Sequence, residues 1–284
     1  RYFFFKNDGL QNQSVLYVQE DLEAEAEVLL DPNTLSEDGT VALAGMAVSH
    51  NGEYLAYAIS RGGSDWREIF VKNIETGEQL EDHLKWSKFS NISWYKNGFF
   101  YSRYDEPKGS ELSKKNTYHK VYYHELGTKQ SEDELLFENA NEPLRNYSTD
   151  ITRDEKYLFI YETESTSGNN LFVHNLETKV TTQLTTGFNY DYLVLDHIDD
   201  NLIVLTNYKA PKYKLIKINV RSHEIGNWVD ILPEQKDVLS SCELAGDKLV
   251  ATYMTDAHSA MKVFDLKGNL LHNVELPTLG TVSS

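Results

Sequence analysis

The residues that could do chemistry are few, and none of them forms a complete catalytic motif. The stretch from Gly62 to Trp66, Gly-Gly-Ser-Asp-Trp, begins like the Gly-x-Ser-x-Gly turn of a nucleophilic serine, but its last position is Trp. His119 and His124 are five residues apart, so on a strand they point to opposite faces and are not expected to share a metal ion. A phosphate-binding glycine loop, an EF-hand calcium loop and a His-Glu-x-x-His motif are all missing. We therefore expect no metal site, no cofactor and no catalytic residue in this chain.

Cysteine content and charge narrow the class of protein further. One cysteine, Cys242, excludes an internal disulfide and a Cys-based zinc site, and its place at the start of an expected apolar strand predicts an inert core residue. The formal net charge of −17 at pH 7 argues against nucleic acid or an anionic membrane as a partner, because both would repel the chain. No apolar run approaches the ~18 residues that a membrane helix needs. These features favour the cytoplasm, with the periplasm left open.

The elements that must position any functional residue are repeated hairpins, and residues 51–78 are the clearest copy. Asn51-Gly52 is a turn, residues 54–59 are a short apolar run, residues 61–65 form a second turn, and residues 66–74 carry apolar residues at alternating positions. Two β-rich runs around a Gly-containing turn predict an antiparallel hairpin. The last apolar residue of the second run recurs at intervals of 44 to 52 residues, at Ile74, Leu126, Leu176, Val220 and Leu266.

Repeats of about 40–50 residues with four strands each are typical of β-propeller blades. Tandem sandwiches are the alternative all-β arrangement, but they would need domain linkers, and the sequence shows none. We therefore predict an all-β chain that forms a single β-propeller domain over residues 1–284, built from four-stranded antiparallel blades. Six blades are expected, with approximate ranges 1–36, 37–85, 86–141, 142–188, 189–236 and 237–284.

Two segments need separate interpretation. Residues 20–30 would tolerate a helix, but their place in the repeat favours a strand, a turn and a strand. Residues 107–116 are polar and rich in Lys and Ser, so we expect an insertion within one repeat. The acidic residues fall at expected turns and strand ends, where solvation accounts for them.

Several longer strings resemble the prolyl oligopeptidase family, the serine peptidases that cleave short peptides after proline. They are GLQNQSVLY at 9–17, LDPNTLSEDGTVAL at 30–43, GEYLAY at 52–57 with GSDW at 63–66, YYHELGT at 122–128 with QSED at 130–133, and PE at 233–234 with KDVL at 236–239. That family couples a seven-bladed propeller to an α/β-hydrolase domain, which holds the Ser, Asp and His of the catalytic triad. The resemblance implies that this chain has six of the seven blades and lacks the hydrolase domain, so that it cannot hydrolyse peptides by itself.

The resemblance also implies a function and partners. The chain would be the non-catalytic propeller portion of a serine prolyl endopeptidase, which covers the active site and admits only short peptides. Its partners would be the α/β-hydrolase domain of the same parent protein and short proline-containing peptides, and the full-length parent is expected to be a monomer. The alternative is a free-standing β-propeller that serves as a binding scaffold.

Two positions are candidate substrate contacts by this resemblance. Lys88-Phe89-Ser90 matches the family string whose Phe reaches into the apolar pocket for the residue two before the cut, so Phe89 is the first candidate. Without the resemblance, Phe89 would be expected to be a core residue. Asp65 matches an acidic propeller position near the domain interface, and its alternative role is that of a turn-capping residue.

Two further pocket segments depart from the family pattern. The chain is polar around Asn146, where the animal enzymes carry Met, and Thr163 and Thr166 stand where those enzymes carry Arg and Cys. The apolar and charged character of the pocket, and its preference for the upstream substrate residue, therefore need not follow the animal enzymes.

Overall fold

The structure is a computed structural model that describes residues 1–107 and 116–282. The predicted insertion at 107–116 lies almost wholly outside these described residues. Within them, every regular element is a β-strand apart from three short 3-10 helices, so the all-β prediction is confirmed. The chain divides into two compact units, residues 1–150 and residues 151–284. In the described part, no helix is long and apolar enough to cross a membrane. The prediction of one domain with six blade boundaries stays a prediction.

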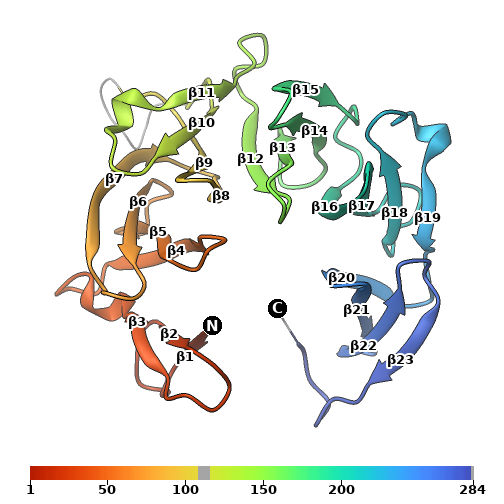
Figure 1. Ribbon diagram of the computed structural model, residues 1–284, viewed down its shortest axis with the longest axis horizontal. Helices are drawn as coiled ribbons and strands as arrows, with labels where there is room; N and C mark the ends of the chain where they lie inside the picture. Colours follow the sequence, from red (N-terminus) through yellow and green to blue (C-terminus); the bar gives the residue numbers. More distant parts are fainter. Residues whose placement is uncertain (108–115, 283–284) are drawn as a thin grey trace. The chain divides into compact units, whose positions relative to one another are not determined.

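The first unit consists of antiparallel sheets formed by strands that follow one another in the sequence (Figure 1). Strands β1, β2 and β3 form one sheet, and β4 to β7 run side by side in the next, followed by β9 to β11 with the short β8 paired to β9. The strands are β1 (Tyr2–Lys6), β2 (Val15–Gln19), β3 (Glu27–Leu30), β4 (Val41–Val48), β5 (Tyr54–Arg61), β6 (Arg67–Asn73), β7 (Gln79–Ser87), β8 (Ser93–Tyr95), β9 (Gly98–Arg103), β10 (Lys120–Glu125), β11 (Glu134–Phe137) and β12 (Asn146–Ile151).

The hairpin predicted at residues 51–78 is present as strands β5 and β6. They pair antiparallel from Tyr54 opposite Asn73 to Ser60 opposite Arg67, and the turn between them contains Asp65. Residues 20–30 are a turn followed by β3, so the strand interpretation of this segment is also confirmed. Local turn chemistry and the two-residue period of strands therefore predicted these elements correctly.

Strand β5 is apolar at successive positions because both of its faces are buried. Leu55, Tyr57 and Ile59 pack in a cluster with residues of β2, β3 and β4. Ala56 and Ala58 face the other way, into a second cluster with residues of β6, β7, β9 and β10. Successive side chains of a strand point to opposite faces, so one apolar run holds the sheets on its two sides together. Each fully buried aliphatic side chain adds about 1.5–3 kcal/mol relative to an exposed one.

The second unit follows the same scheme. Its strands are β13 (Tyr157–Thr163), β14 (Asn170–Asn175), β15 (Val180–Gln183), β16 (Tyr192–Ile198), β17 (Asn201–Thr206), β18 (Lys214–Asn219), β19 (Val229–Leu232), β20 (Val238–Ala245), β21 (Lys248–Thr255), β22 (His258–Asp265) and β23 (Leu270–Val274). Strand β14 pairs with β13 on one side and β15 on the other, and β16 to β19 and β20 to β23 form one sheet each.

Strand β17 has the role in the second unit that β5 has in the first. Leu202 and Val204 face a cluster that contains residues of β13 and β14, whereas Ile203 and Leu205 face one that contains residues of β20 and β21. Cys242 lies in this last cluster, as predicted, and burial raises the pKa of its thiol to about 12. A protonated, buried thiol is unreactive, so Cys242 is a packing residue.

Candidate functional site

The segment from Trp86 to Ser90, which contains the last two residues of β7 and the start of the connection to β8, is held in place by buried serines. Ser102 on β9 donates its backbone N–H to Ser90 Oγ at 2.7 Å, and Ser87 Oγ donates to the Ser102 carbonyl at 3.0 Å. All three serines are buried. The backbone pair between Ser87 and Arg103 also connects β7 to β9 at this point. The segment, which we call the 86–90 loop, is therefore fixed from both of its ends.

The 86–90 loop contains two bulky residues with left-handed backbone conformations. The φ angle is 63° at Trp86 and 52° at Phe89. A left-handed conformation costs a non-glycine residue about 1–2 kcal/mol, so it persists only where the surroundings enforce it. Tyr104 contributes by donating its backbone N–H to the Trp86 carbonyl at 3.0 Å. Such strain is concentrated at functional sites in proteins, and this makes the loop the first candidate for a site.

Phe89 and Asp65, the two candidates from the sequence, both lie beside the side chain of Lys88. Phe89 is 50% exposed and belongs to the loop, so it is not the core residue that its type alone would suggest. The Lys88 ammonium lies 5.2 Å from the centre of the Phe89 ring and 3.1 Å from Asp65 Oδ2. It also lies 5.4 Å from the Trp66 ring. Sequence reasoning quoted Lys88 only as part of a matching string and missed that it joins the two candidates.

His119 supports this region as a neutral side chain. It is 1% exposed and its ring lies 4.5 Å from that of Tyr104, the residue that holds the Trp86 carbonyl. Its Nδ1 accepts a hydrogen bond from the Tyr147 backbone N–H at 2.9 Å. Burial lowers the pKa of His119 to about 3, so it carries no charge near neutral pH and serves as a packing element.

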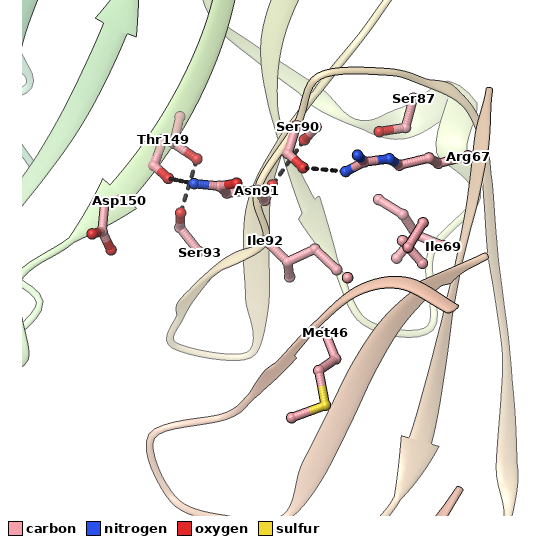
Figure 2. A pocket seen from close by; sticks show the side chains of 13 residues that line it. Met46, Arg67, Ile69, Ser87, Ser90, Asn91, Ile92, Ser93, Thr149 and Asp150 are labelled. Carbon is pink, nitrogen blue, oxygen red and sulfur yellow. Dashed lines mark hydrogen bonds between the residues drawn. The ribbon is translucent and has the colours of Figure 1, made fainter. Parts of the chain in front are cut away.

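A cavity of about 290 Å³ lies next to the 86–90 loop, along strands β4 and β8 and the end of β12 (Figure 2). Arg67 donates through Nη1 to the Ser90 carbonyl at 3.2 Å on one side of it. On the other side, the hydroxyls of Ser93 and Thr149 are 2.8 Å apart, and Asn91 points toward the same group. The lining residues are Ala44, Gly45, Met46, Ala58, Arg67, Ile69, Ser87, Ser90, Asn91, Ile92, Ser93, Thr149 and Asp150.

The cavity's composition suits weak, polar binding better than catalysis. Small hydroxyl and amide side chains form one part of its wall, and Met46, Ile69 and Ile92 form another. None of the lining residues is a Cys, a His or a Lys. The hydroxyls of Ser93 and Thr149 bond to each other, and Asp150 supplies the one carboxylate among the lining residues. Hydroxyl and amide groups of this kind can donate to and accept from a peptide group.

Asn146, where the sequence departs from the animal enzymes, also contacts this region. It lies on β12, and its Oδ1 accepts a hydrogen bond from the hydroxyl of Tyr104. The polar side chain is thus used in a bond to the aromatic group that supports the 86–90 loop. A Met at this position could not accept in the same way.

One buried cluster escaped the sequence analysis. His124 is fully buried on β10; its Nδ1 lies 2.7 Å from Asp133 Oδ1, and its Nε2 lies 3.0 Å from Asp82 Oδ1. Tyr101 donates its hydroxyl to Asp133 at 2.5 Å, and the Gly127 backbone N–H donates to Asp82 at 2.7 Å. The interpretation of the acidic residues as solvated is therefore wrong for Asp82 and Asp133, since both carboxylates are 2% exposed or less.

The charge state of this cluster follows from its hydrogen bonds. Burial alone would lower the pKa of His124, but the bonds to Asp133 and Asp82 outweigh it and raise the pKa to about 9. The same bond holds the pKa of Asp82 below its ordinary value in spite of burial. His124 is therefore an imidazolium between two carboxylates, an arrangement that connects β7 to β10. Across residues 1–107 and 116–282, no group of three or more His, Cys, Asp or Glu side chains could hold a metal ion.

Comparison with known proteins identifies the family. The family model described as "Prolyl oligopeptidase, N-terminal beta-propeller domain" matches residues 1–284. The chain belongs to the prolyl oligopeptidase family. Its antiparallel sheets therefore form a β-propeller, as the repeat length predicted. Several of the strings quoted above as a resemblance, such as LDPNTLSEDGTVAL at 30–43, lie in this matched region.

Named relatives of the prolyl oligopeptidase family match nearly the whole chain. A prolyl endopeptidase of Elizabethkingia meningoseptica is 41% identical over 99% of this chain, which corresponds to 40% of that relative. Prolyl oligopeptidase A of Amanita bisporigera is 29% identical over 100% of this chain and 42% of its own length. The chain thus spans about 40% of the length of the curated relatives it matches.

Solved structures agree with the family assignment. A chain from a structural and mechanistic study of two prolyl endopeptidases superposes with a TM-score of 0.87 at 33% identity, covering 99% of this chain and 41% of that one. The apo form of prolyl oligopeptidase B from Galerina marginata gives 0.87 at 28% identity, over 99% of this chain and 43% of that one. The described part of the chain therefore has the backbone fold of the matching region in these prolyl oligopeptidases.

Proposed function

We propose that this chain is the gating part of a serine prolyl endopeptidase. It would act with an α/β-hydrolase domain of the same protein, cover that domain's active site and admit only short proline-containing peptides. The observation that carries the proposal is the match of all 284 residues to the propeller domain of the family, in relatives named as prolyl endopeptidases of which the chain covers about 40%. A propeller of this kind would contribute to such a reaction through access and binding.

Phe89 is proposed as the contact between the propeller and the substrate. Its ring is half exposed, so it can be partly covered by a ligand with a gain in buried apolar area. The bonds of Ser87 and Ser90 to Ser102 hold the backbone on both sides of Phe89, which limits the positions that the ring can take before binding. A ring that is already fixed loses less conformational freedom when the substrate arrives.

Asp65 is proposed as a positioning residue in this site. Its carboxylate holds the Lys88 ammonium at 3.1 Å, and that ammonium lies over the Phe89 ring. Asp65 belongs to the β5–β6 turn, so the contact connects this turn to the 86–90 loop. Its side chain is 69% exposed, which leaves it accessible to a partner domain or to substrate.

The proposal is tested with the full-length protein and a set of six-residue peptides that contain one internal proline. We expect cleavage on the carboxyl side of proline, detected by mass spectrometry, and complete loss of cleavage after treatment with a fluorophosphonate that reacts with an activated serine. Peptides in which alanine replaces the proline are the matched control and should remain intact. Binding of the proline peptides without any cleavage would instead support the scaffold alternative.

A further inference from the structure

A second pocket shares Arg67 with the cavity of Figure 2, and the proposed gating role does not use it. Its volume is about 430 Å³, within the range typical of small-molecule sites. It opens between the β5–β6 turn and the end of β7. Arg67 lines both this pocket and the 290 Å³ cavity. The lining residues are Arg61, Ser64, Trp66, Arg67, Glu68, Lys85 and Trp86.

Aromatic rings form one wall of this pocket. The Trp66 and Trp86 rings meet edge to face with centroids 5.7 Å apart, and Trp66 meets Tyr104 in the same way at 5.9 Å. Tyr104 also donates its backbone N–H to the Trp86 carbonyl, which helps to fix that residue. Rigid indoles offer large contact area with little loss of conformational freedom, and aromatic-lined grooves bind proline rings and other apolar rings of peptides.

The charged residues of the lining are more positive than negative: Arg61, Arg67 and Lys85 against Glu68. Glu68, the acidic residue of the lining, is already used: its two oxygens lie 2.6 Å from Arg61 Nε and 2.6 Å from His83 Nε2. In the part of the chain that the structure describes, neither Arg67 nor Lys85 has a carboxylate partner. Arg67 donates instead to the Ser90 carbonyl. Nearby Asp65 is paired with Lys88 and does not neutralise them.

This local excess of positive charge stands out in a chain with a net charge of −17. A guanidinium whose bond is to a neutral carbonyl can form a stronger, charge-assisted bond to a carboxylate. Arg67 is half-buried, so such a bond is less weakened by solvent than one on an open surface. The pocket therefore offers an apolar surface and an anion-binding surface side by side.

We propose that this pocket is a peptide subsite that takes a proline or aromatic ring against Trp66 and Trp86 and a neighbouring Asp or Glu carboxylate on Arg67 and Lys85. The ligand class is a short acidic peptide segment. The inference rests on the proposed function in one respect, namely that peptides reach this face of the propeller. It adds a selectivity for acidic over neutral and basic peptides that the gating role does not require.

The test is a binding measurement on the full-length protein with fluorescently labelled six-residue peptides of one length. The bond after proline is replaced by a reduced, uncleavable one, and the residue next to proline is Glu, Gln or Lys. We expect the Glu peptide to bind about fivefold more tightly than the Gln peptide, with the Lys peptide weakest. The preference for Glu over Gln should shrink when the salt concentration rises from 50 to 500 mM, because screening weakens the ion pairs.

Variants separate the two halves of the proposed subsite. Arg67→Gln and Lys85→Gln should each reduce the preference for the Glu peptide over the Gln peptide. Trp86→Leu should lower the affinity for all three peptides by the same factor. Lys248→Gln is the matched control, because it removes the same charge from an exposed position at the start of β21 in the second unit. This control should keep the full preference. Circular dichroism and thermal unfolding establish that each variant is folded.

Equal affinity of the unmodified protein for the Glu and Gln peptides would overturn the inference. So would a preference that survives in both Arg67→Gln and Lys85→Gln. If one of these variants fails to fold, the other variant and the salt dependence of the unmodified protein decide. These peptides share one length and are not cleaved. The binding comparison therefore tests the subsite even if the protein proves to have no length limit or no peptidase activity.

Discussion

The ammonium of Lys88 lies 3.1 Å from the carboxylate of Asp65. The Lys88 side chain is 14% exposed, whereas that of Asp65 is 69% exposed, so the pair sits at the boundary between protein and solvent. Exposed ion pairs contribute at most about 1 kcal/mol to stability. The value of this pair is therefore geometric: it keeps Lys88 over the rings of Trp66 and Phe89 and defines the surface on which both proposed peptide contacts lie.

Replacing Phe89 tests its proposed role as a substrate contact. Phe89→Ala should raise KM severalfold for peptides with an apolar residue two positions before the cut, with little change in kcat, because the lost contact is made in the ground state as well. Peptides with Gly at that position should be unaffected. Phe89→Gly should show the same kinetic change but unfold about 1 kcal/mol less readily than Phe89→Ala, since glycine adopts the φ of 52° without strain. An unchanged KM in both variants would remove Phe89 from the site.

Replacing Ser90 tests whether the 86–90 loop is held by its buried serines. Ser90→Ala leaves the buried Ser102 backbone N–H without its partner at 2.7 Å, which should lower the free energy of unfolding by about 1–3 kcal/mol. Ser87→Ala should lower stability less. It removes one donor to the Ser102 carbonyl, and that oxygen has a second lone pair that can still accept a hydrogen bond. Urea unfolding measures both. We also expect Ser90→Ala to raise KM for the substrates that respond to Phe89, and equal stability of the two variants would contradict this account.

Stability should fall as the pH rises because His124 is protonated in the folded state. Its pKa is about 9 when folded, because the bonds to Asp133 and Asp82 outweigh the effect of burial, and ordinary histidine has a pKa near 6.5. A raised folded pKa gives stability that is complete below about pH 6.5 and is lost as the pH passes through 9. The loss should approach about 3 kcal/mol, measured as the free energy of unfolding in urea between pH 6 and pH 9.5.

A variant isolates this contribution of His124. His124→Gln should be less stable at pH 6 by about 3–5 kcal/mol, because it leaves two buried carboxylates without their cation. The free energy of unfolding of this variant should also change much less between pH 6 and pH 9.5 than that of the unmodified protein. His83→Gln, at a partly exposed histidine paired with Glu68, serves as the comparison and should keep that decline. An equally steep decline in His124→Gln would show that other groups cause it.

The hairpins and the candidate site differed in how far the sequence could predict them. Strands β5 and β6 follow from alternation and from a Gly-containing turn, which are local features. The ion pairs of His124 do not, because Asp82 is 42 residues away in sequence and is brought close only when β7 and β10 pack. Phe89 was predicted from the resemblance of Lys88-Phe89-Ser90 to a family string. The position of Lys88 between Asp65 and Phe89 could not be predicted in this way, because it depends on the β5–β6 turn lying beside the 86–90 loop. Long-range packing of this kind leaves no periodic signal in the sequence.

Gly98 should be intolerant of any side chain because of its neighbour on β10. A Cβ at Gly98 would lie 2.1 Å from the His124 carbonyl oxygen, far inside the contact distance, and the backbone would have to move. We expect Gly98→Ala to lower the free energy of unfolding by more than about 2 kcal/mol. Gly45→Ala is the matched control on β4, with no atom within 4 Å of the added carbon, and should change stability by less than about 0.5 kcal/mol. Thermal unfolding of the two variants side by side gives the comparison, and similar values for both would be inconsistent with the packing described.

The gating role is tested most directly by the dependence of cleavage on substrate length. The measurement is kcat/KM of the full-length protein for one proline-containing sequence of ten residues, alone and embedded in an unfolded chain of eighty residues. If the propeller restricts access, kcat/KM should be at least about tenfold lower for the long chain, a difference of about 1.4 kcal/mol in the barrier. Equal values for the short and the long substrate would contradict the account.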